Sequence, residues 1–315
     1  EFNKIDNQSS SDWIKKEINE LKDISNLEIK TRTSVAAYHG YNYLLARENL
    51  TDHLEKKDKK NKIRQRLLKI RAKKVILATG ALERPLIFNN NDRPGIMLST
   101  AVKKYADFFG VKCGEKNVFF TNNDSAYESA LCLYNKGIKV DAIIDIRNNS
   151  NSKIVKAVEQ IGIQIYWSHT VVDTNGYRRL NNISIMKLSN DGMTVTGDRI
   201  NISCDCLGVA GGWTPAVHLF TQSGGKLKFD EDNNVFLPNK YPSDQISVGS
   251  CNGNFNLKEI INELSIKLKE FLKINQTDFD NITIESEEET SKRNIWLLPS
   301  DKVIGKTKPF VDYQN

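Results

Sequence analysis

The sequence predicts an α/β protein in which two parallel-sheet domains are interleaved, each with an antiparallel meander. The first observation is a complete β-α-β pattern over 117–147, in which two apolar runs flank a helical stretch that ends at Gly137. The second is a pair of short apolar runs, at 73–80 and 205–215, that contain glycines at their ends and lie on either side of this pattern. The third is period-2 alternation over 169–203, which is typical of antiparallel strands. One domain is therefore expected to be inserted into the other.

Length and composition are consistent with this fold. A chain of 315 residues and 35.8 kDa can hold two domains with separate cores. The composition, 39% apolar and 27% charged, is that of a soluble globular protein, and no apolar run is long enough to cross a bilayer. A cytoplasmic location without membrane contact is the default expectation.

The basic character of the chain is local. The net charge is +6 and the pI about 8.9, but the positive excess is concentrated in Lys56–Lys74. That run lacks interleaved aromatic residues and any base-reading motif, so we interpret it as a solvated loop and strand edge. No nucleic-acid partner is expected.

The reactive side chains form no recognisable catalytic or metal-binding motif. Five cysteines without a secretory signal indicate reduced thiols, and the pair Cys204 and Cys206 has no second pair or His cluster to complete a metal site. His169 and His218 have no nucleophile at a known spacing, so the catalytic residues stay unassigned and any redox chemistry must come from cofactors or another subunit.

Residues 1–98 are expected to form the C-terminal half of the outer domain. Residues 11–22 place apolar side chains at helical spacing, and the following segment alternates as two or three antiparallel strands that continue beyond the basic run. Residues 73–80 have the pattern of a strand buried on both faces. The stretch 82–98, with two prolines, is interpreted as an extended connection.

Residues 99–212 are expected to form the inserted domain. A helix capped by Ser99 or Thr100 precedes the β-α-β pattern, and a second helix and strand over 152–167 predict a doubly wound parallel sheet. The meander over 169–203 and a buried strand complete this domain.

The chain then returns to the outer domain over 213–273. Here we expect a short helix, a hairpin around Asn233, and a strand, turn and helix between 245 and 273. Residues 274–315 are interpreted as a linker whose partner lies outside this chain.

Three strand-to-glycine junctions make up the candidate binding site: Ala78-Thr79-Gly80, Ala210-Gly211-Gly212 and Val248-Gly249-Ser250. Ligands of parallel sheets bind beyond the carboxyl ends of the strands, where glycine allows the backbone to approach a phosphate or ribose. The order of the junctions predicts two interleaved Rossmann-like, FAD/NAD(P)-binding domains, as in pyridine-nucleotide-disulfide reductases. The candidate cofactor-binding residues are Thr79, Gly80, Arg84, Asn122, Asn123, Ser125, Gly211, Gly212, Trp213, Gly249, Ser250, Asn252 and Gly253.

The inserted domain lacks a glycine fingerprint, since no G-x-G-x-x-G occurs in the chain. Its place is taken by Thr121–Ala126, where Asn122, Asn123 and Ser125 either bind a ligand or cap the helix. Asp145, 24 residues after Thr121, favours a ribose 2′-hydroxyl, but the nearby Arg147 weakens that inference.

The chain contains five distinctive strings: RQRLLKIRAKKVILATG, ATGALERPLIFNNNDRPGIMLSTAV, VFFTNNDSAYESAL, CDCLGVAGGWTPAVHLFTQSGGKLKFDE and KPFVDYQN. They resemble the alpha subunit of heterotetrameric sarcosine oxidase, over about 25–265 and again at the end of the chain. Related subunits of opine-type dehydrogenases and of hydrogen cyanide synthase share the ATG and GGW-type blocks but fit the other strings less well.

The resemblance implies a complex with beta, gamma and delta subunits that oxidatively demethylates sarcosine to glycine. It implies FAD in the complex, FMN at the interface with the beta subunit, NAD in the alpha subunit, peroxide formation and one-carbon transfer to tetrahydrofolate. By this comparison the chain is an internal fragment without the N-terminal glycine fingerprint and the C-terminal folate-binding domain, and is expected to be inactive alone. We expect NAD in the outer domain, where Cys251 replaces the acidic residue of similar flavoenzymes.

Other functions stay open at this point. The chain could belong to a related flavin- or NAD(P)-dependent amine or opine dehydrogenase, or be a flavin reductase of the two-domain class, which usually has an intact fingerprint and a redox-active cysteine pair. It could also be a non-catalytic scaffold that binds a cofactor and partner subunits.

Overall fold

The computed structural model describes residues 4–285, 292–302 and 306–311, in two compact units. Unit 1 comprises Glu1–Leu82 and Thr214–Ser286, and unit 2 comprises Glu83–Trp213 and Glu287–Asn315. Two of the unit boundaries fall within the short strands β7 (Ala81–Glu83) and β16 (Trp213–Pro215). The domain limits expected from the sequence, at 98, 212 and 273, stay predictions.

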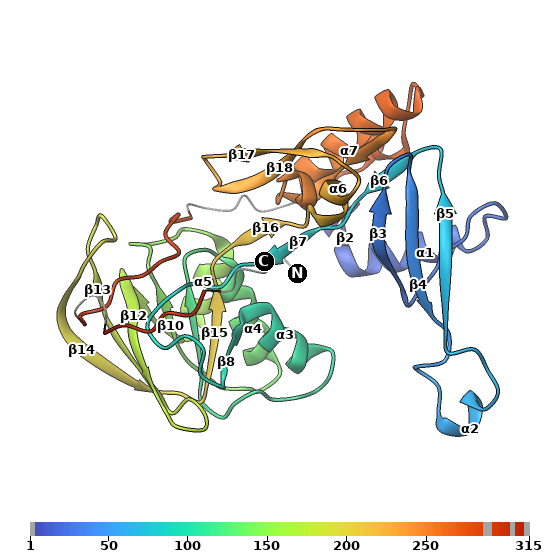
Figure 1. Ribbon diagram of the computed structural model, residues 1–315. Helices are drawn as coiled ribbons and strands as arrows, with labels where there is room; N and C mark the ends of the chain where they lie inside the picture. Colours follow the sequence, from blue (N-terminus) through green and yellow to red (C-terminus); the bar gives the residue numbers. More distant parts are fainter. Residues whose placement is uncertain (1–3, 286–291, 303–305, 312–315) are drawn as a thin grey trace. The chain divides into compact units, whose positions relative to one another are not determined.

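Unit 2 contains a five-stranded parallel sheet (Figure 1). Its strand order is β11-β10-β9-β15-β8. The strands are β8 (Ile96–Leu98), β9 (Asn117–Thr121), β10 (Val140–Asp145), β11 (Gln164–Trp167) and β15 (Cys206–Ala210). The β-α-β pattern predicted from the sequence is confirmed, but β8 lies within the stretch expected to be only a connection.

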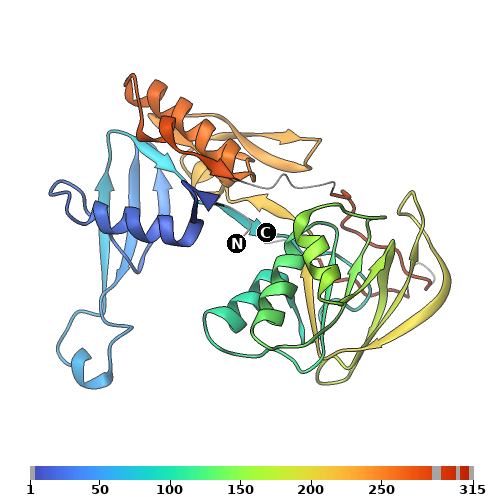
Figure 2. The same cartoon turned by 180° about the vertical axis from the view of Figure 1, so that it is seen from behind.

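Three helices cover one face of this sheet: α3 (Ser99–Asp107), α4 (Ser125–Asn135) and α5 (Lys153–Gln160) (Figures 1 and 2). Alternation along β9 divides the core, because Phe119 packs with the helices and Phe120 packs on the opposite face. The prediction that Ser99 or Thr100 caps α3 is wrong. Instead the carboxylate of Glu83 accepts a hydrogen bond from the Thr100 N–H at 2.9 Å.

The opposite face of the parallel sheet packs against an antiparallel meander. It consists of β12 (His169–Asn175), β13 (Asn182–Leu188) and β14 (Val195–Ser203). Apolar side chains of β12 and β13 share one core with those of β9, β10 and β15. The meander predicted from the sequence is confirmed, and in unit 2 it takes the place that helices hold on the second face of a doubly wound sheet.

The N-terminal part of unit 1 contains helix α1 (Ser10–Leu21) and an antiparallel sheet of β3 (Thr33–His39), β4 (Tyr43–Asn49) and β5 (Gln65–Arg71). Both were predicted. No residue of α1 is buried, and Ile14 and Ile18 are 48% and 43% exposed. The basic run forms the short helix α2 (Lys56–Lys59), a loop and β5, mostly exposed as expected.

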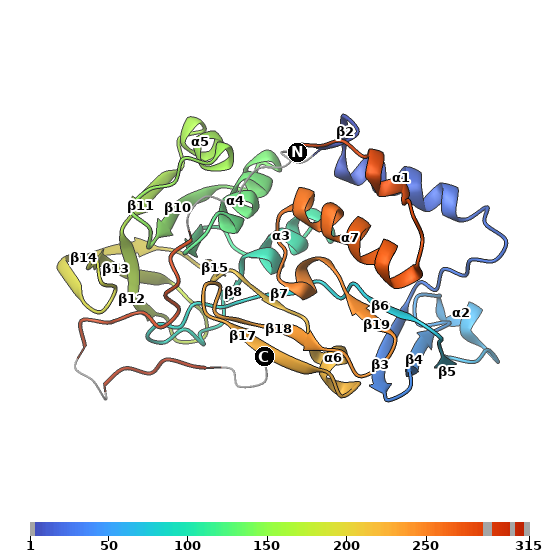
Figure 3. The same cartoon turned by 90° about the horizontal axis from the view of Figure 1, so that it is seen from above.

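The rest of unit 1 surrounds the parallel pair β6 (Val75–Leu77) and β19 (Gln245–Ser247) (Figure 3). This part of the unit contains helix α6 (His218–Gln222), the hairpin of β17 (Lys226–Asp230) and β18 (Val235–Lys240), the 3-10 helix η1 (Gly249–Asn252) and helix α7 (Leu257–Leu272). The short elements β1 (Lys4–Ile5), β2 (Gln8–Ser9), η2 (Asp278–Asn281) and β20 (Ile284–Glu285) complete the unit. The prediction that the β6 strand is buried on both faces is wrong, because Ile76 is 43% exposed.

The C-terminal residues of the described chain lie along unit 2. Ile87 bridges to Leu297 in parallel, and the Asn90 N–H donates to the Lys308 carbonyl at 3.0 Å. The expectation that 274–315 is a linker stays a prediction, but residues 292–302 have fixed partners in this unit.

Candidate functional site

Two of the three predicted glycine junctions lie side by side in unit 1. Strands β6 and β19 run parallel with Leu77 opposite Ser247, and the Val248 N–H donates to the Leu77 carbonyl at 3.0 Å. Thr79 and Gly249 each follow two residues after these paired strand ends, so both lie at the carboxyl edge of the pair. This is the edge at which parallel sheets bind ligands.

The first junction is open and has a left-handed glycine. Gly80 has φ of +74°, and no heavy atom lies within 4 Å of the position that a Cβ would take there. The Gly80 carbonyl accepts from the Ala216 N–H at 2.9 Å, and the Thr79 hydroxyl donates to the Ala216 carbonyl at 2.8 Å. These bonds fix the junction, while Thr79 remains exposed.

The second junction turns directly into η1. Gly249 has φ of +72°, and Gly253, which ends η1, has φ of +92°. A Cβ on Gly253 would lie 2.7 Å from Leu237 Cδ2, so this turn packs tightly against the β17–β18 hairpin. Glycine is required at both positions by conformation, and at Gly253 also by space. Ser250 and Asn252 lie between them on η1.

Glu263 of α7 organises this turn and was missed in the sequence. Its carboxylate accepts hydrogen bonds from the Gly249 N–H at 3.2 Å, from Asn252 Nδ2 at 2.5 Å and from Asn254 Nδ2 at 2.7 Å. It also pairs with Lys267 at 2.6 Å. Burial opposes the charge, but the hydrogen bonds from Lys267 and Asn254 outweigh it and lower the pKa of Glu263. The only sequence signal was an i, i+4 Glu–Lys pair, which usually marks a solvated helix face.

Cys251 joins the two strands from within the turn. Its side chain is 2% exposed, and its Sγ donates to the Leu77 carbonyl at 3.3 Å and the Val248 carbonyl at 3.2 Å. The thiol therefore contacts the ends of both β6 and β19. It is placed as a structural group at the candidate site rather than as an exposed nucleophile.

In unit 2 the candidate side chains at the end of β9 bind one another. Asn123 Oδ1 accepts from the Ser125 N–H at 2.8 Å and from the Ser125 hydroxyl at 2.6 Å. Asn123 Nδ2 donates to Asn122 Oδ1 at 2.7 Å. Asn122 and Asn123 are 2% and 1% exposed. This geometry favours a capping role over ligand binding for Asn123, which satisfies a free N–H of the first turn of α4 next to the N-cap residue Asp124. Ser125 is the first helical residue and does not cap the helix.

A buried ion-pair network occupies the end of β10. Arg147 Nη2 lies 2.7 Å from Asp145 Oδ2, its Nη1 lies 2.8 Å from Asp124 Oδ1, and the Tyr127 hydroxyl donates to Asp145 Oδ2 at 2.8 Å. Asp145 is completely buried, and Arg147 is 3% exposed. Burial opposes the Arg147 charge, but Asp145 and Asp124 outweigh it and raise the pKa of the guanidinium. The oxygens of the carboxylate expected to bind a ribose are thus engaged by Arg147 and Tyr127.

The remaining candidates lie near the end of β15. The Gly211 N–H donates to the Arg84 carbonyl at 2.7 Å, and the Arg84 N–H donates to the Gly212 carbonyl at 2.8 Å. A Cβ on Gly211 would lie 2.8 Å from the Pro85 carbonyl oxygen, so glycine permits this close approach. Trp213 follows at the start of β16 and is half-buried. The structure therefore divides the thirteen candidates between two edges, one in each unit.

Neither edge holds a group of metal-binding side chains. Within residues 4–285, 292–302 and 306–311 there is no cluster of three or more His, Cys, Asp or Glu residues suited to a metal ion. Burial raises the pKa of both Cys204 and Cys206 to about 12, so neither thiol ionises readily. Across the same residues, no helix combines the length and hydrophobicity that a membrane span needs.

Comparison with known proteins agrees with this architecture. A family model described as pyridine nucleotide-disulphide oxidoreductase matches residues 11–246. The chain belongs to this oxidoreductase family. The family implies flavin and pyridine-nucleotide binding at the edges of its parallel sheets.

The curated relatives give a more specific likeness. The chain is 34% identical to the sarcosine oxidase subunit alpha of Corynebacterium sp. (strain P-1), over 98% of the chain and 32% of that protein. It is also 34% identical to the sarcosine oxidase subunit alpha of Corynebacterium sp. (strain U-96), over 79% of the chain and 26% of that protein. The chain thus spans about a third or less of the length of these relatives, which are named as subunits of multi-subunit enzymes.

A solved structure supports the fold alone. The L-proline dehydrogenase of P. horikoshii superposes with a TM-score of 0.58 and 20% sequence identity. The match covers 90% of this chain and 50% of that one. Together with the family match, it confirms the two-domain α/β fold expected from the sequence.

Proposed function

We propose that this chain is the dinucleotide-binding portion of a sarcosine oxidase alpha subunit. In the complete complex, sarcosine is oxidatively demethylated to glycine, oxygen is reduced to hydrogen peroxide, and the one-carbon unit passes to tetrahydrofolate. The likeness to the two Corynebacterium subunits over most of the chain supports this function. The catalytic residues stay unassigned, and we propose that the chemistry belongs to the assembled complex, at cofactors that other chains help to hold.

The observation that carries the proposal is the parallel pairing of β6 with β19. It places Thr79-Gly80 and Gly249 at one carboxyl edge, with both glycines in the left-handed conformation. Backbone at such an edge can approach a pyrophosphate closely, which a Cβ would prevent. The open space at Gly80 gives the nucleotide room at the first junction.

We assign NAD to this edge, with Thr79, Gly80, Ser250 and Asn252 as lining residues. Bound NAD would lie against the two junctions, which hydrogen bonds within unit 1 already fix, without accepting the electrons of the reaction. The buried Cys251 supports NAD rather than FAD, since similar flavoenzymes have an acidic residue in this turn. Glu263 already holds the Gly249 N–H, so the turn is shaped before the nucleotide arrives.

The other cofactors belong to partner surfaces. FMN is proposed at the interface with a beta subunit, and FAD and tetrahydrofolate in the remaining parts of a complex that also contains gamma and delta subunits. A cytoplasmic location accompanies this assignment, since free thiols persist in a reducing compartment.

The cofactor assignment can be tested on the natural protein, purified with the subunits that accompany it. Heat denaturation should release NAD, identified by chromatography and mass, in proportion to the alpha subunit. Release of FAD alone, with no NAD, would refute the assignment. A Gly80→Ala variant should retain less NAD, because its Cβ enters the space left open at the first junction.

The reaction can be tested separately. Sarcosine-dependent peroxide formation should require a beta-type partner and should be absent when the alpha subunit is assayed alone. Robust peroxide formation by the alpha subunit alone would contradict the proposed division of labour. If the complex binds NAD but oxidises another secondary amine and not sarcosine, the NAD site is supported and sarcosine is wrong as the proposed substrate.

A further inference from the structure

Residues 292–302 form a strap across unit 2, and their contacts lie at the ends of three neighbouring strands. The register of the parallel sheet makes Thr121, Asp145 and Ala210 level at the carboxyl ends of β9, β10 and β15. The next residue of each strand is Asn122, Ile146 or Gly211. The strap binds the backbone carbonyl of all three.

Arg293 makes the contacts with the first two strands. Its N–H donates to the Asn122 carbonyl at 3.2 Å, and Asn122 Nδ2 donates back to the Arg293 carbonyl at 3.1 Å. Its Nη1 donates to the Ile146 carbonyl at 2.6 Å. Its Nη2 donates to the carbonyls of Ser189 and Asn190 at 2.8 and 2.7 Å. A guanidinium with several backbone acceptors is held in one orientation.

Trp296 makes the contact with the third strand. Its indole N–H donates to the Gly211 carbonyl at 2.6 Å, and the Arg84 guanidinium lies 4.5 Å from the centre of its ring. Ile87 forms a parallel bridge with Leu297 of the strap. Its N–H donates to the Trp296 carbonyl at 2.7 Å, and its carbonyl accepts from the Leu298 N–H at 2.8 Å. The Leu298 side chain enters the core between the two sheets and is 5% exposed.

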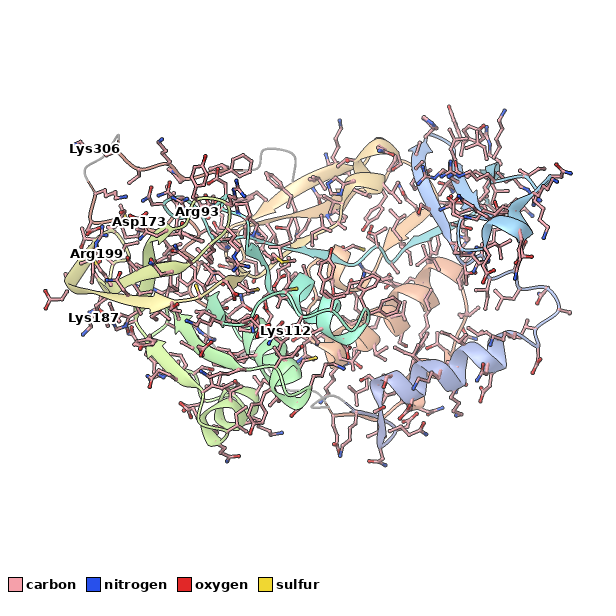
Figure 4. All side chains as sticks on the ribbon, turned by 90° about the horizontal axis from the view of Figure 1, so that it is seen from below. Arg93, Lys112, Asp173, Lys187, Arg199 and Lys306 are labelled. Atoms are coloured by element: carbon pink, nitrogen blue, oxygen red, sulfur yellow. The ribbon has the colours of Figure 1, made fainter. Side chains whose placement is uncertain are left out.

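Ion pairs also hold the C-terminal end of the strap, at Asp301 and Lys302. Lys302 Nζ lies 2.6 Å from Asp173 Oδ2, and Arg199 donates from Nε and Nη2 to the two oxygens of Asp301 at 2.6 and 2.5 Å. Figure 4 shows Asp173 and Arg199 close together in unit 2. The Arg199–Asp301 pair has the bidentate geometry that orients both partners.

We propose that the strap is a built-in occupant of the ligand edge of unit 2, so that this unit binds no dinucleotide while the strap is in place. A nucleotide on a parallel sheet lies beyond the carboxyl ends of the central strands, where Arg293 and Trp296 now make their hydrogen bonds. The turn after β9 cannot bind the strap and a nucleotide at the same time, because Asn122 Nδ2 already donates to the strap. Of the two sheet edges that the structure describes, only the one in unit 1 is then open to a dinucleotide. The inference rests on the proposed function only for the choice of NAD as the probe.

Hydrogen exchange on the purified protein can test this closure with NAD as the probe. In the wild type, saturating NAD should not slow exchange at the amides of Ser125, Ile146 and Gly211. In the double variant Arg293→Ala/Trp296→Ala, without NAD, the same amides should exchange about tenfold faster, because hydrogen bonds that cover the edge are lost. The matched control is Arg178→Ala/Tyr177→Ala, which removes one arginine and one aromatic from an exposed loop of the same unit.

Either of two results would overturn the proposal: slowing of these unit 2 amides by NAD in the wild type, or unchanged exchange in the double variant. Should the double variant fail to fold, Arg293→Lys tests the same edge more gently, since a single ammonium cannot reproduce the forked contacts. If NAD slows amides in neither unit, the proposed NAD site in unit 1 falls. The exchange of the strap variants then still decides whether the strap closes unit 2.

Discussion

Two parallel-strand edges of this molecule end in glycine junctions, yet their surroundings differ. In unit 1, Thr79 is exposed and Gly80 has open space beside it. In unit 2, Asn122 and Asn123 are buried and bonded to neighbours. Polar groups of both edges are bound within their own unit, so the edges differ in exposure: the unit 1 junction has an exposed side chain and open space, whereas the unit 2 side chains are buried. A strand that ends in glycine marks a possible site, and the exposure of its junction decides whether a ligand can reach it.

The charged groups of the two edges differ in the same way. Unit 1 uses a carboxylate, Glu263, to bind N–H groups and fix a turn. Unit 2 neutralises a carboxylate, Asp145, with the buried Arg147. Glu263 fixes the conformation of a glycine junction in unit 1, whereas Arg147 occupies the carboxylate that would bind a ribose in unit 2. The following predictions test this difference, from the largest expected effect to the smallest.

Arg147→Ala should have the largest effect. It leaves Asp145 buried without its cation, which costs about 3–5 kcal/mol in the free energy of unfolding of unit 2. The measurement is urea unfolding followed by tryptophan fluorescence. Trp167 is a local reporter, because its ring stacks on that of Tyr127 with centroids 6.3 Å apart.

A double variant sharpens this result. Arg147→Met/Asp145→Asn removes both charges, so it should be less destabilised than the single variant. Arg178→Ala, at an exposed position of the same unit, should change stability by less than about 0.5 kcal/mol. A single variant as stable as the wild type would show that the network does not hold this edge.

Glu263→Gln should have the next largest effect, in unit 1. Charge-assisted hydrogen bonds to Gly249 and Asn252 are weakened, at a cost of about 1.5–3 kcal/mol. Because the folded state lowers the pKa of Glu263, this stabilisation is present above the unfolded-state pKa and is lost as the pH falls through the folded-state pKa. The difference between wild type and variant in urea unfolding should therefore be full at neutral pH and shrink in acid.

The control for Glu263 is Glu270→Gln, a change of the same kind at an exposed position of α7. It should change the free energy of unfolding by less than about 0.5 kcal/mol at neutral pH, because its side chain is exposed. A constant gap between the Glu263 variant and the wild type from neutral to acid pH would contradict the role assigned to this carboxylate.

The sequence was sufficient for elements with strong local patterns. Strand β9 was predicted with its observed bounds, Asn117–Thr121, because four consecutive apolar or β-branched residues, Val118 to Thr121, lie between polar turns. Strand β8 (Ile96–Leu98) was missed because three residues after Pro94-Gly95 give no periodicity. Its place in the sheet is set by pairing with β15, more than 100 residues away.

The site was only partly predictable for the same reason. The glycine junctions are local features, and their backbone conformations follow from the residue type. The roles of Glu263 and Arg293 depend on partners distant in sequence, and each side chain alone has the pattern of a solvated charge. Arg147 gave a partial signal, since its position two residues after Asp145 already cast doubt on a ribose site.

The glycines offer a matched pair of substitutions. Gly80 and Gly212 both have left-handed φ, +74° and +88°, and at neither would a Cβ meet an atom closer than 3.9 Å. Alanine should therefore cost each unit a similar amount, about 1–2 kcal/mol, through backbone strain. Only Gly80→Ala should weaken NAD binding, by about tenfold if one close backbone contact is lost.

Equilibrium dialysis with NAD would measure this difference. Equal weakening by both variants would mean that the nucleotide depends on both edges. Weakening by Gly212→Ala alone would move the site to unit 2 and contradict the assignment to unit 1.

The smallest expected effect belongs to Asn123→Ala. As the residue that accepts from the Ser125 N–H at the start of α4, Asn123 should contribute about 1 kcal/mol to the stability of unit 2. Asn123→Asp keeps the acceptor for the Ser125 N–H but loses the Nδ2 donor to Asn122 Oδ1 and buries a charge there, so it should be no more stable than Asn123→Ala in a urea unfolding series. NAD binding should be the same in all three proteins, because a cap acts on the helix and not on a ligand. If Asn123→Ala weakened NAD binding while Asn123→Asp failed to restore it, the amide would be a ligand-binding group, and the buried edge of unit 2 would have to open to admit the nucleotide.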